Sequence, residues 1–296
     1  MKISVVITTW NSQKTLKQTL SSVAWADEII VVDGTSSDKS AEIAKKAKAA
    51  VFVRPNNPML NVNKNFGFEN ASGDWILSLD ADEEIPADLA REIQKKIKRK
   101  DVAGYWIPRK NIQFGKWVQH GIWWPDPQLR LFQKGKGAFP QKHVHEYLAV
   151  EGKTETLEAA MVHYNYSSIS QFIRKMDTLY TPSEVAKHQA AGYRVSWQDA
   201  IRFPVSEFVK LYFAQGMYKD GLHGLVLAGL QSVYSFVVFA KLWEEEGFPD
   251  QRPDLSSVSR EFAGTKREVS YWMQSAVIEN ERNPLKKIIL KVKRRL

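Results

Sequence analysis

The stretch ILSLDADEEIPAD, residues 76–88, decides the fold. Its apolar run, Ile76 to Leu79, has the composition of a buried strand. Four of the next five residues are acidic. In α/β proteins, ligands collect at the carboxyl ends of the sheet strands. The stretch therefore predicts a buried strand whose tip carries functional carboxylates.

The preceding chain alternates strand-like and helical patterns. Strands are predicted at residues 3–10, 28–34, 49–55 and 74–80, and helical segments between them at 12–23, 37–48 and 61–71. Such alternation implies right-handed crossovers and a mostly parallel sheet with helices on both faces. Because Asn11, Asp33 and Asp80 all lie where predicted strands end, we expect them on one rim of that sheet.

The composition is that of an ordinary globular protein. With 296 residues, 44% of them hydrophobic, the chain can bury one large core or two modest ones. It contains no cysteine, which excludes disulfides, thiolate metal sites and cysteine nucleophiles and fits a reducing compartment. The first residues, MKISVVITTW, lack a small-residue cleavage site. We expect a first strand there rather than a signal peptide, and a cytoplasmic protein.

Two changes of pattern divide the chain. Residues 1–165 are predicted to form the catalytic α/β domain, with 1–100 as one half and the aromatic-rich 101–165 as the other. Residues 166–296 are predicted to be helical. Within them, 221–240 contain no charged side chain and are long enough to span a bilayer, although His223, Gln231 and three glycines weaken that interpretation. A spanning helix, a monotopic or buried helix and an ordinary core helix all remain open.

The net charge of +9 is concentrated in two basic clusters. The first, residues 91–100, has the pattern of a solvated helix face. In the second, residues 285–296, Ile288, Ile289 and Val292 alternate with lysines and arginines, a pattern typical of helices that lie on anionic membranes. No nucleic-acid-reading motif accompanies the charge, so we expect a membrane partner and no nucleic acid.

The two aspartates at the strand tip suggest a cation site. Asp80 and Asp82 are separated by one residue, so both carboxylates can face the same space. Oxygen ligands suit Mg²⁺ or Mn²⁺, which can neutralise a departing diphosphate. The alternative is that the acids begin a helix, where negative charge favours the helix dipole. We interpret Glu83 and Glu84 in that way, but a helix start does not explain both aspartates.

Three motifs in order resemble those of the family-2 glycosyltransferases of GT-A fold. They are VVITTWN (5–11), IIVVDGTSSDKS (29–40) and NKNFGFENASGDWILSLDADEEI (63–85). The resemblance covers residues 1–90 and implies that this half binds a nucleotide-diphosphate sugar, with a UDP-sugar expected. It also implies a divalent cation, Mn²⁺ or Mg²⁺.

The resemblance assigns roles to individual residues of the first half. It implies a nucleotide pocket lined by Thr8, Thr9, Trp10 and Asn11, a base or ribose contact at Asp33, donor contacts at Lys64 and Asn65, ribose and metal-water contacts at Asp80 and Ala81, and a metal ligand at Asp82. From the residues alone, Asp33 can instead be a turn residue and Lys64 a solvated helix lysine.

Inverting sugar transfer also needs a base for the acceptor hydroxyl, and residues 1–90 do not supply one. WWPDPQLRLF (123–132), KHVHEYL (142–148) and a strand ending at His163 follow in that order. This order resembles a subgroup that includes bacterial lipopolysaccharide-core glucosyltransferases. The resemblance spans residues 105–165 and implies that they form the acceptor side.

Several roles in this second half remain alternatives. Asp126 is the expected base, with Arg130 near the diphosphate, although Pro125 replaces the glutamate that usually precedes this aspartate in the family. Glu146 is the competing base. The remaining candidates are His145 as a metal ligand or diphosphate contact, Trp123 and Trp124 as acceptor-stacking or core residues, and His163 as a structural histidine or a ligand.

Together these patterns predict a cytoplasmic enzyme, peripheral or monotopic at the cell membrane. It would move a hexose with inversion from a nucleotide-diphosphate sugar to a lipid-linked or cell-envelope saccharide. A nucleotidyltransferase is an alternative, although TTWNSQKT (8–15) replaces its glycine-rich phosphate loop. A non-catalytic, membrane-bound nucleotide-sugar binding protein is another, although it would need no base. The oligomeric state is not predicted.

Overall fold

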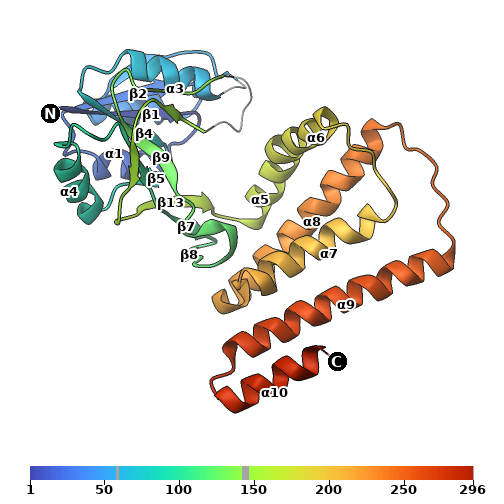
Figure 1. The fold of residues 1–296 in the computed structure, drawn as a ribbon. Helices are drawn as coiled ribbons and strands as arrows, with labels where there is room; N and C mark the ends of the chain where they lie inside the picture. Colours follow the sequence, from blue (N-terminus) through green and yellow to red (C-terminus); the bar gives the residue numbers. More distant parts are fainter. Residues whose placement is uncertain (58–59, 142–146, 296) are drawn as a thin grey trace. The chain divides into compact units, whose positions relative to one another are not determined.

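The computed structural model describes residues 1–57, 60–141 and 147–295 (Figure 1). The chain forms two compact units. The first comprises Met1–Gln113 and Trp123–Asn165, and the second comprises Phe114–Ile122 and Tyr166–Leu296. Each unit has its own hydrophobic clusters.

A seven-stranded sheet forms the centre of the first unit, in the order β12-β6-β9-β4-β1-β2-β3. Strands β1 to β4 are mutually parallel, whereas β9 runs antiparallel to both β4 and β6. The mostly parallel sheet predicted from the sequence is therefore confirmed. The strands are β1 (Ile3–Thr9), β2 (Glu28–Asp33), β3 (Ala50–Val53), β4 (Trp75–Asp80), β6 (Gly104–Ile107), β9 (Gln128–Gln133) and β12 (Thr154–Thr156).

Helices cover both faces of this sheet (Figure 1). One face packs against α1 (Leu16–Ser22), α2 (Ser40–Lys46) and α4 (Ala87–Lys96), and the other against α3 (Leu60–Glu69). Alternate residues of β1 serve the two faces: Val5 belongs to the α1 side and Val6 to the α3 side. A β-carbon at Gly67 would lie 2.4 Å from Val6 Cγ1, so glycine permits the close approach of α3 to the sheet.

A smaller sheet brings the acidic motif against distant strands. β5 (Glu83–Glu84) pairs antiparallel with β13 (Met161–Tyr166), and β7 (Arg109–Gln113) is the next strand beyond β13. Our interpretation of Glu83 and Glu84 as a helix start was wrong. They form β5, whereas α4 begins at Ala87 and has Asp88 in its first turn. The shorter elements are β8 (Lys116–Trp117), the 3₁₀ turn Gly121–Trp123, β10 (Gly137–Ala138) and β11 (Ala149–Val150).

The second unit is helical, as predicted. Val185, Val238 and Leu242 belong to one of its clusters, and Phe172 and Met176 to another. Its helices are α5 (Ile169–Lys175), α6 (Thr181–Ala190), α7 (Asp199–Val209), α8 (Leu222–Glu245), α9 (Leu255–Asn280) and α10 (Pro284–Arg295). Two π-helical turns, Met176–Tyr180 and Lys210–Ala214, and the 3₁₀ turn Met217–Asp220 join them.

Helix α8 has the length and composition of a membrane-crossing helix. Only 22% of its apolar window is buried, and Leu222, Val233 and Phe236 are exposed. A core helix of a soluble protein would bury most of such a segment. Of the three alternatives for residues 221–240, the ordinary core helix fits this exposure least well.

Helix α10 lies against α9 and leaves its apolar residues exposed. Lys287 Nζ donates to the carbonyl of Glu279 at 3.1 Å, and the Arg294 guanidinium donates to Ser275 Oγ at 2.7 Å. The Arg294 guanidinium also lies 4.8 Å from the centre of the Tyr271 ring. The exposed apolar residues of α10 are Leu285, Ile288, Ile289 and Val292.

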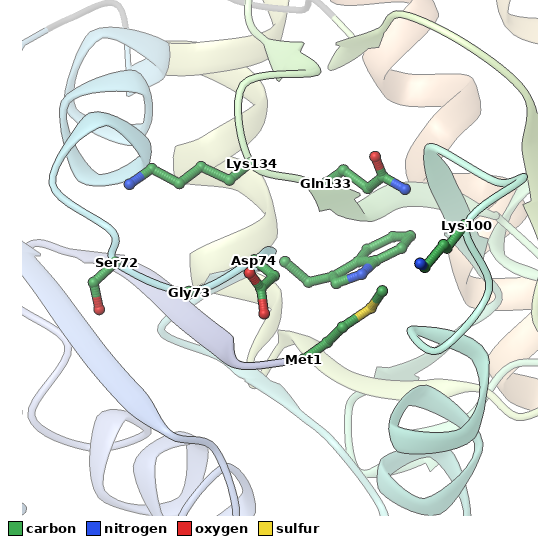
Figure 2. Close-up of a pocket in the computed structure, with 8 residues that line it drawn as sticks. Met1, Ser72, Gly73, Asp74, Lys100, Gln133 and Lys134 are labelled. Atoms are coloured by element: carbon green, nitrogen blue, oxygen red, sulfur yellow. The ribbon is translucent and has the colours of Figure 1, made fainter.

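A pocket of about 490 Å³ lies at the amino end of the main sheet (Figure 2). Met1 precedes β1, and Asp74 precedes β4. The rim that bears Asp80 lies at the opposite end of β4, on the order of 17–20 Å away at the usual strand rise. This pocket is therefore separate from the rim predicted to bind the donor.

Candidate active site

The centre of the candidate site is the carboxylate of Asp80 at the end of β4. Lys64 Nζ lies 2.7 Å from its Oδ1, and Arg130 Nη2 lies 2.5 Å from its Oδ2. The Asp80 side chain keeps 33% of its surface exposed, whereas both cations are buried. One partly exposed anion is therefore held from behind by two buried cations.

The topology explains why these three side chains meet. β9 pairs antiparallel with β4, with Leu77 opposite Leu131. That register places Arg130 next to the carboxyl end of β4, although it lies 50 positions from Asp80 in the sequence. Lys64 reaches the same carboxylate from α3, on one face of the sheet.

These cations change the acidity of Asp80. Burial by itself would raise the pKa of this carboxyl, but the charges and hydrogen bonds of Arg130 and Lys64 outweigh burial and hold the pKa well below its usual value of 3.8. The carboxylates of Asp80 and Glu83 in turn raise the pKa of Arg130 against the effect of its burial. Asp80 is therefore ionised throughout the physiological range.

We expect Asp80→Asn to lower the free energy of unfolding at pH 7. Since the pKa of Asp80 is lower in the folded protein, its charge stabilises the fold above the usual value of 3.8, and this contribution is lost as the pH falls through the lowered pKa. The difference between wild type and variant should therefore shrink below pH 4. Urea unfolding at pH 7, 5, 4 and 3 measures it, with Asp88→Asn as a surface control. A difference that stays constant with pH would contradict this assignment.

Glu83 lies directly behind Asp80 and has no exposed side-chain surface. Its Oε2 accepts the backbone N–H of Asp80 at 2.9 Å. Its Oε1 lies 2.8 Å from Arg130 Nη2 and 3.5 Å from Arg109 Nη1. The third acid of the motif is thus an internal anion shared by two arginines.

Asp126 is held in a turn ahead of β9. Its Oδ2 accepts hydrogen bonds from Arg109 Nε at 2.9 Å, Arg109 Nη2 at 2.6 Å and Asn111 Nδ2 at 2.8 Å. Its Oδ1 accepts one hydrogen bond, from Gln128 Nε2 at 3.0 Å, among the residues that the structure describes. Since a carboxylate oxygen can accept two hydrogen bonds, Oδ1 can accept a hydrogen bond from a further donor.

Asn111 links this carboxylate to His163. The Asn111 amide nitrogen donates to Trp123 O at 2.9 Å and to Asp126, so its Oδ1 is the acceptor for His163 Nδ1 at 2.7 Å. His163 Nδ1 therefore carries a proton, and in the neutral ring Nε2 has the lone pair. That Nε2 lies 3.8 Å from Asp82 Oδ1.

The Asp82–His163 pair fits a divalent cation. A carboxylate oxygen and an imidazole nitrogen are both ligands of Mn²⁺-type ions, and Asp82 keeps 30% of its side chain exposed. Within the described ranges, no group of three or more histidine or acidic side chains is arranged to hold a metal. His145, the predicted third ligand, lies outside the described residues, as does the competing base Glu146.

The residues predicted to line the nucleotide pocket differ in exposure. Trp10 and Asn11 are exposed beyond β1, whereas Thr9 is buried and its Oγ1 has no hydrogen-bond partner among the described residues. Asp33 is buried, and its two oxygens accept from the N–H and hydroxyl of Ser36. These bonds suit the alternative of a turn residue. The base or ribose contact of Asp33 stays a prediction.

Other predicted residues have defined positions. Asn65 exchanges two hydrogen bonds with the backbone of Phe139, at 2.9 Å each. Ala81 is buried, and its carbonyl accepts from Thr19. Thr8 is half-buried on β1, opposite Asp80 in the β1–β4 register. Lys64 is not the solvated helix lysine of the alternative interpretation, because it is buried against Asp80.

The tryptophan pair divides between two environments. Trp123 is only 5% exposed, so its ring offers little face to a sugar, and the acceptor-stacking role predicted for it is not supported. Trp124 is half-buried and remains a candidate.

Arg130 is also buried, and its Nη2 donates to both Asp80 and Glu83. The diphosphate contact of Arg130 stays a prediction.

Four residues of this network were not among the predicted site residues. They are Glu83, Arg109, Asn111 and His163. Glu83 adjoins the motif and His163 ends an apolar strand, so both carried a sequence signal that we interpreted as structural. Arg109 and Asn111 lie on β7, in a part of the sequence whose pattern carried no such signal.

Comparison with known proteins identifies the domain. Residues 4–148 match the family model described as Glycosyl transferase family 2. The chain contains a family-2 glycosyltransferase domain. It is therefore an enzyme, and the non-catalytic binding protein is excluded. Asp80, Asp82 and Asp126 all lie within the matched range.

Relatives of this glycosyltransferase include one that is named for lipopolysaccharide core biosynthesis and one that is named as an undecaprenyl-phosphate sugar transferase. The lipopolysaccharide core biosynthesis glycosyltransferase LpsC of Rhizobium meliloti is 24% identical over 267 residues, covering 86% of this chain and 96% of LpsC. An undecaprenyl-phosphate 4-deoxy-4-formamido-L-arabinose transferase of Salmonella choleraesuis is 34% identical over 117 residues, 35% of this chain and 36% of that protein. The solved structure of S. aureus TarS 1–349 with UDP is 15% identical with a TM-score of 0.46, covering 87% of this chain and 95% of that one.

Proposed function

We propose that this family-2 enzyme transfers a hexose with inversion from a UDP-sugar to a lipid-linked or cell-envelope saccharide. The observation that carries the proposal is the convergence of Asp80, Asp82 and Asp126 on one network at the carboxyl end of the sheet. The names of the relatives support the class of acceptor.

In this proposal Asp126 is the general base. Its Oδ1 takes the proton of the acceptor hydroxyl as the acceptor oxygen bonds to the anomeric carbon of the donor. The bond from that carbon to the diphosphate oxygen breaks, and the electron pair leaves with the nucleoside diphosphate. Arg109 and Asn111 hold Oδ2, so the carboxylate is already oriented when the acceptor binds.

Asp82 and His163 would hold the divalent cation, Mn²⁺ or Mg²⁺, of the donor complex. When bound, such a cation supplies Lewis-acid stabilisation of the leaving diphosphate. Asp80, held by Lys64 and Arg130, would contact the donor beside this cation. Thr9, with a buried hydroxyl that lacks a partner among the described residues, is a further candidate for a donor contact.

The helical unit would hold the enzyme at the inner face of the cell membrane. The exposed apolar residues of α8 and α10 supply the surface for insertion, and the bases of α10 would meet anionic headgroups. The arrangement keeps a soluble nucleotide-sugar and a lipid-linked acceptor within reach of one enzyme.

Replacing Asp82 with asparagine tests the donor site. We expect Mn²⁺-dependent binding of UDP to weaken by more than about tenfold, because a neutral amide is a poor ligand. Isothermal titration of UDP with and without Mn²⁺ measures this, and thermal shift with a panel of nucleotide-sugars identifies the donor.

The control for this test is Asp88→Asn, because Asp88 is an exposed acid in the first turn of α4. It should bind Mn²⁺ and UDP as the wild type does. Full transfer activity and an unchanged Mn²⁺ response in Asp82→Asn would remove the cation assignment.

A further inference from the structure

Glu83 is the most completely buried charged group of the site. Its side chain has no exposed surface, and within the described residues its carboxylate contacts only Asp80, Arg130 and Arg109. Oε1 lies 2.8 Å from Arg130 and 3.5 Å from Arg109, and Oε2 accepts the backbone N–H of Asp80 at 2.9 Å. Glu83 belongs to the acidic motif in residues 1–100, and both arginines come from residues 101–165. Glu83 therefore links the two halves of the domain.

Each arginine that Glu83 holds has a second carboxylate on the rim. Arg130 Nη2 reaches Asp80 Oδ2 at 2.5 Å. Arg109 reaches Asp126 Oδ2 through Nε at 2.9 Å and Nη2 at 2.6 Å. The contacts form one chain from Asp80 through Arg130, Glu83 and Arg109 to Asp126. A donor-side carboxylate and the proposed base are thus linked through one buried anion.

Stability alone does not account for such a chain. Replacing a buried ion pair by apolar residues of similar volume is often neutral or stabilising, because both charges lose their hydration when they are buried. Removing only one partner is destabilising, since the other charge is left unpaired. The buried glutamate also fixes orientation: it holds the two guanidinium groups where Arg130 Nη2 reaches Asp80 and where Arg109 Nε and Nη2 reach Asp126.

We propose that Glu83 is a positioning residue that sets the placement of the base Asp126 relative to the donor-side carboxylate Asp80. It touches neither substrate and acts through Arg109 and Arg130. This inference rests on the proposed function, because it takes Asp126 as the base. It assigns a role in the reaction to the third acid of the motif, which follows the two aspartates.

Replacing Glu83 with glutamine tests the inference. Glutamine keeps the size of the side chain but removes its charge, and its NH₂ group must face an N–H donor of Arg130 or Asp80. We expect kcat to fall by about tenfold to 10²-fold, the effect of a catalytic group displaced by an ångström or less. The matched control is Glu84→Gln, because Glu84 is the other residue of β5 and makes no contact in the chain described above. Its kcat should stay within about twofold of wild type, as expected of a site outside the network.

A double-mutant cycle with Asp126→Asn separates positioning from a merely structural role. If Glu83 acts through the base, Glu83→Gln should change kcat by less than about twofold in the Asp126→Asn background, because no base remains to be misplaced. An equal fold-loss in both backgrounds would overturn the proposal. So would a kcat of Glu83→Gln equal to that of Glu84→Gln.

Folding of each variant is followed by thermal melting. If Glu83→Gln does not fold, Glu83→Asp enters the same cycle, since it keeps the charge on a side chain one methylene shorter. Failure of both to fold would show that Glu83 serves stability and would overturn the proposal. If Asp126→Asn alone retains full transfer, the base assignment of the proposed function fails instead, whatever the result in Glu83.

Discussion

Replacing Asp126 with asparagine is expected to lower the rate of sugar transfer by a factor of about 10² to 10⁴, the usual contribution of a general base. Asparagine matches aspartate in shape but cannot take a proton from the acceptor hydroxyl. Donor binding should change little, because the donor-side contacts come from Asp80 and Asp82 in this proposal. The measurement is kcat for transfer from a UDP-sugar, together with the affinity for UDP and Mn²⁺.

The competing base supplies the contrast for this experiment. Glu146 lies outside the described residues, and Glu146→Gln should retain transfer if Asp126 is the base. Full activity of Asp126→Asn together with loss of activity in Glu146→Gln would transfer the role to Glu146. Since Asp126→Asn also removes a partner of Arg109, its melting temperature must be measured, so that a loss of activity is not confused with unfolding.

Deleting residues 284–296 is expected to release the protein from anionic vesicles, with the partition coefficient falling by about 10² or more. Each lysine or arginine near an anionic surface contributes about 1 kcal/mol. The deletion also removes the exposed apolar residues of α10. Some of these bases already have protein partners, such as Lys286 with Glu281 at 2.9 Å and Arg294 with Ser275. The loss of binding free energy is therefore expected to be smaller than the sum of the contributions of all the bases.

Co-sedimentation with vesicles of anionic and of neutral lipid measures this effect. Ile288→Ser combined with Ile289→Ser keeps every charge of α10 and tests the apolar contribution separately. Lys291→Glu combined with Lys293→Glu keeps the helix length and tests the charge. Unchanged binding of the truncated protein would refute the role of the tail and would leave α8, with its exposed Leu222 and Phe236, as the membrane contact.

The order of the strands and helices could be predicted because it follows from local patterns. The four apolar runs before residue 81 became β1 to β4. Their polar ends meet on one edge because parallel strands share their carboxyl ends. The motif of Asp80 and Asp82 was found in the same way. Where the prediction failed, at Glu83, an acidic residue that looks like a helix start by sequence is buried as a strand residue.

Prediction was weaker for the acceptor half because its contacts depend on pairings between distant segments. Trp123 and Trp124 are adjacent and chemically identical, yet only Trp124 keeps appreciable exposed surface. Burial therefore favours the core interpretation of Trp123 over the stacking interpretation, a choice that the residue type alone does not make.

The sequence by itself determined an α/β sheet with helices on both faces, a helical C-terminal region and a pair of aspartates at a strand tip, since apolar periodicity and strand ends are local properties. Only the tertiary structure placed Arg130 beside Asp80 and His163 beside Asp82. Those neighbours depend on the antiparallel registers of β9 on β4 and of β13 on β5. A register is chosen by the burial of whole strand faces across the sheet, so no local pattern contains it.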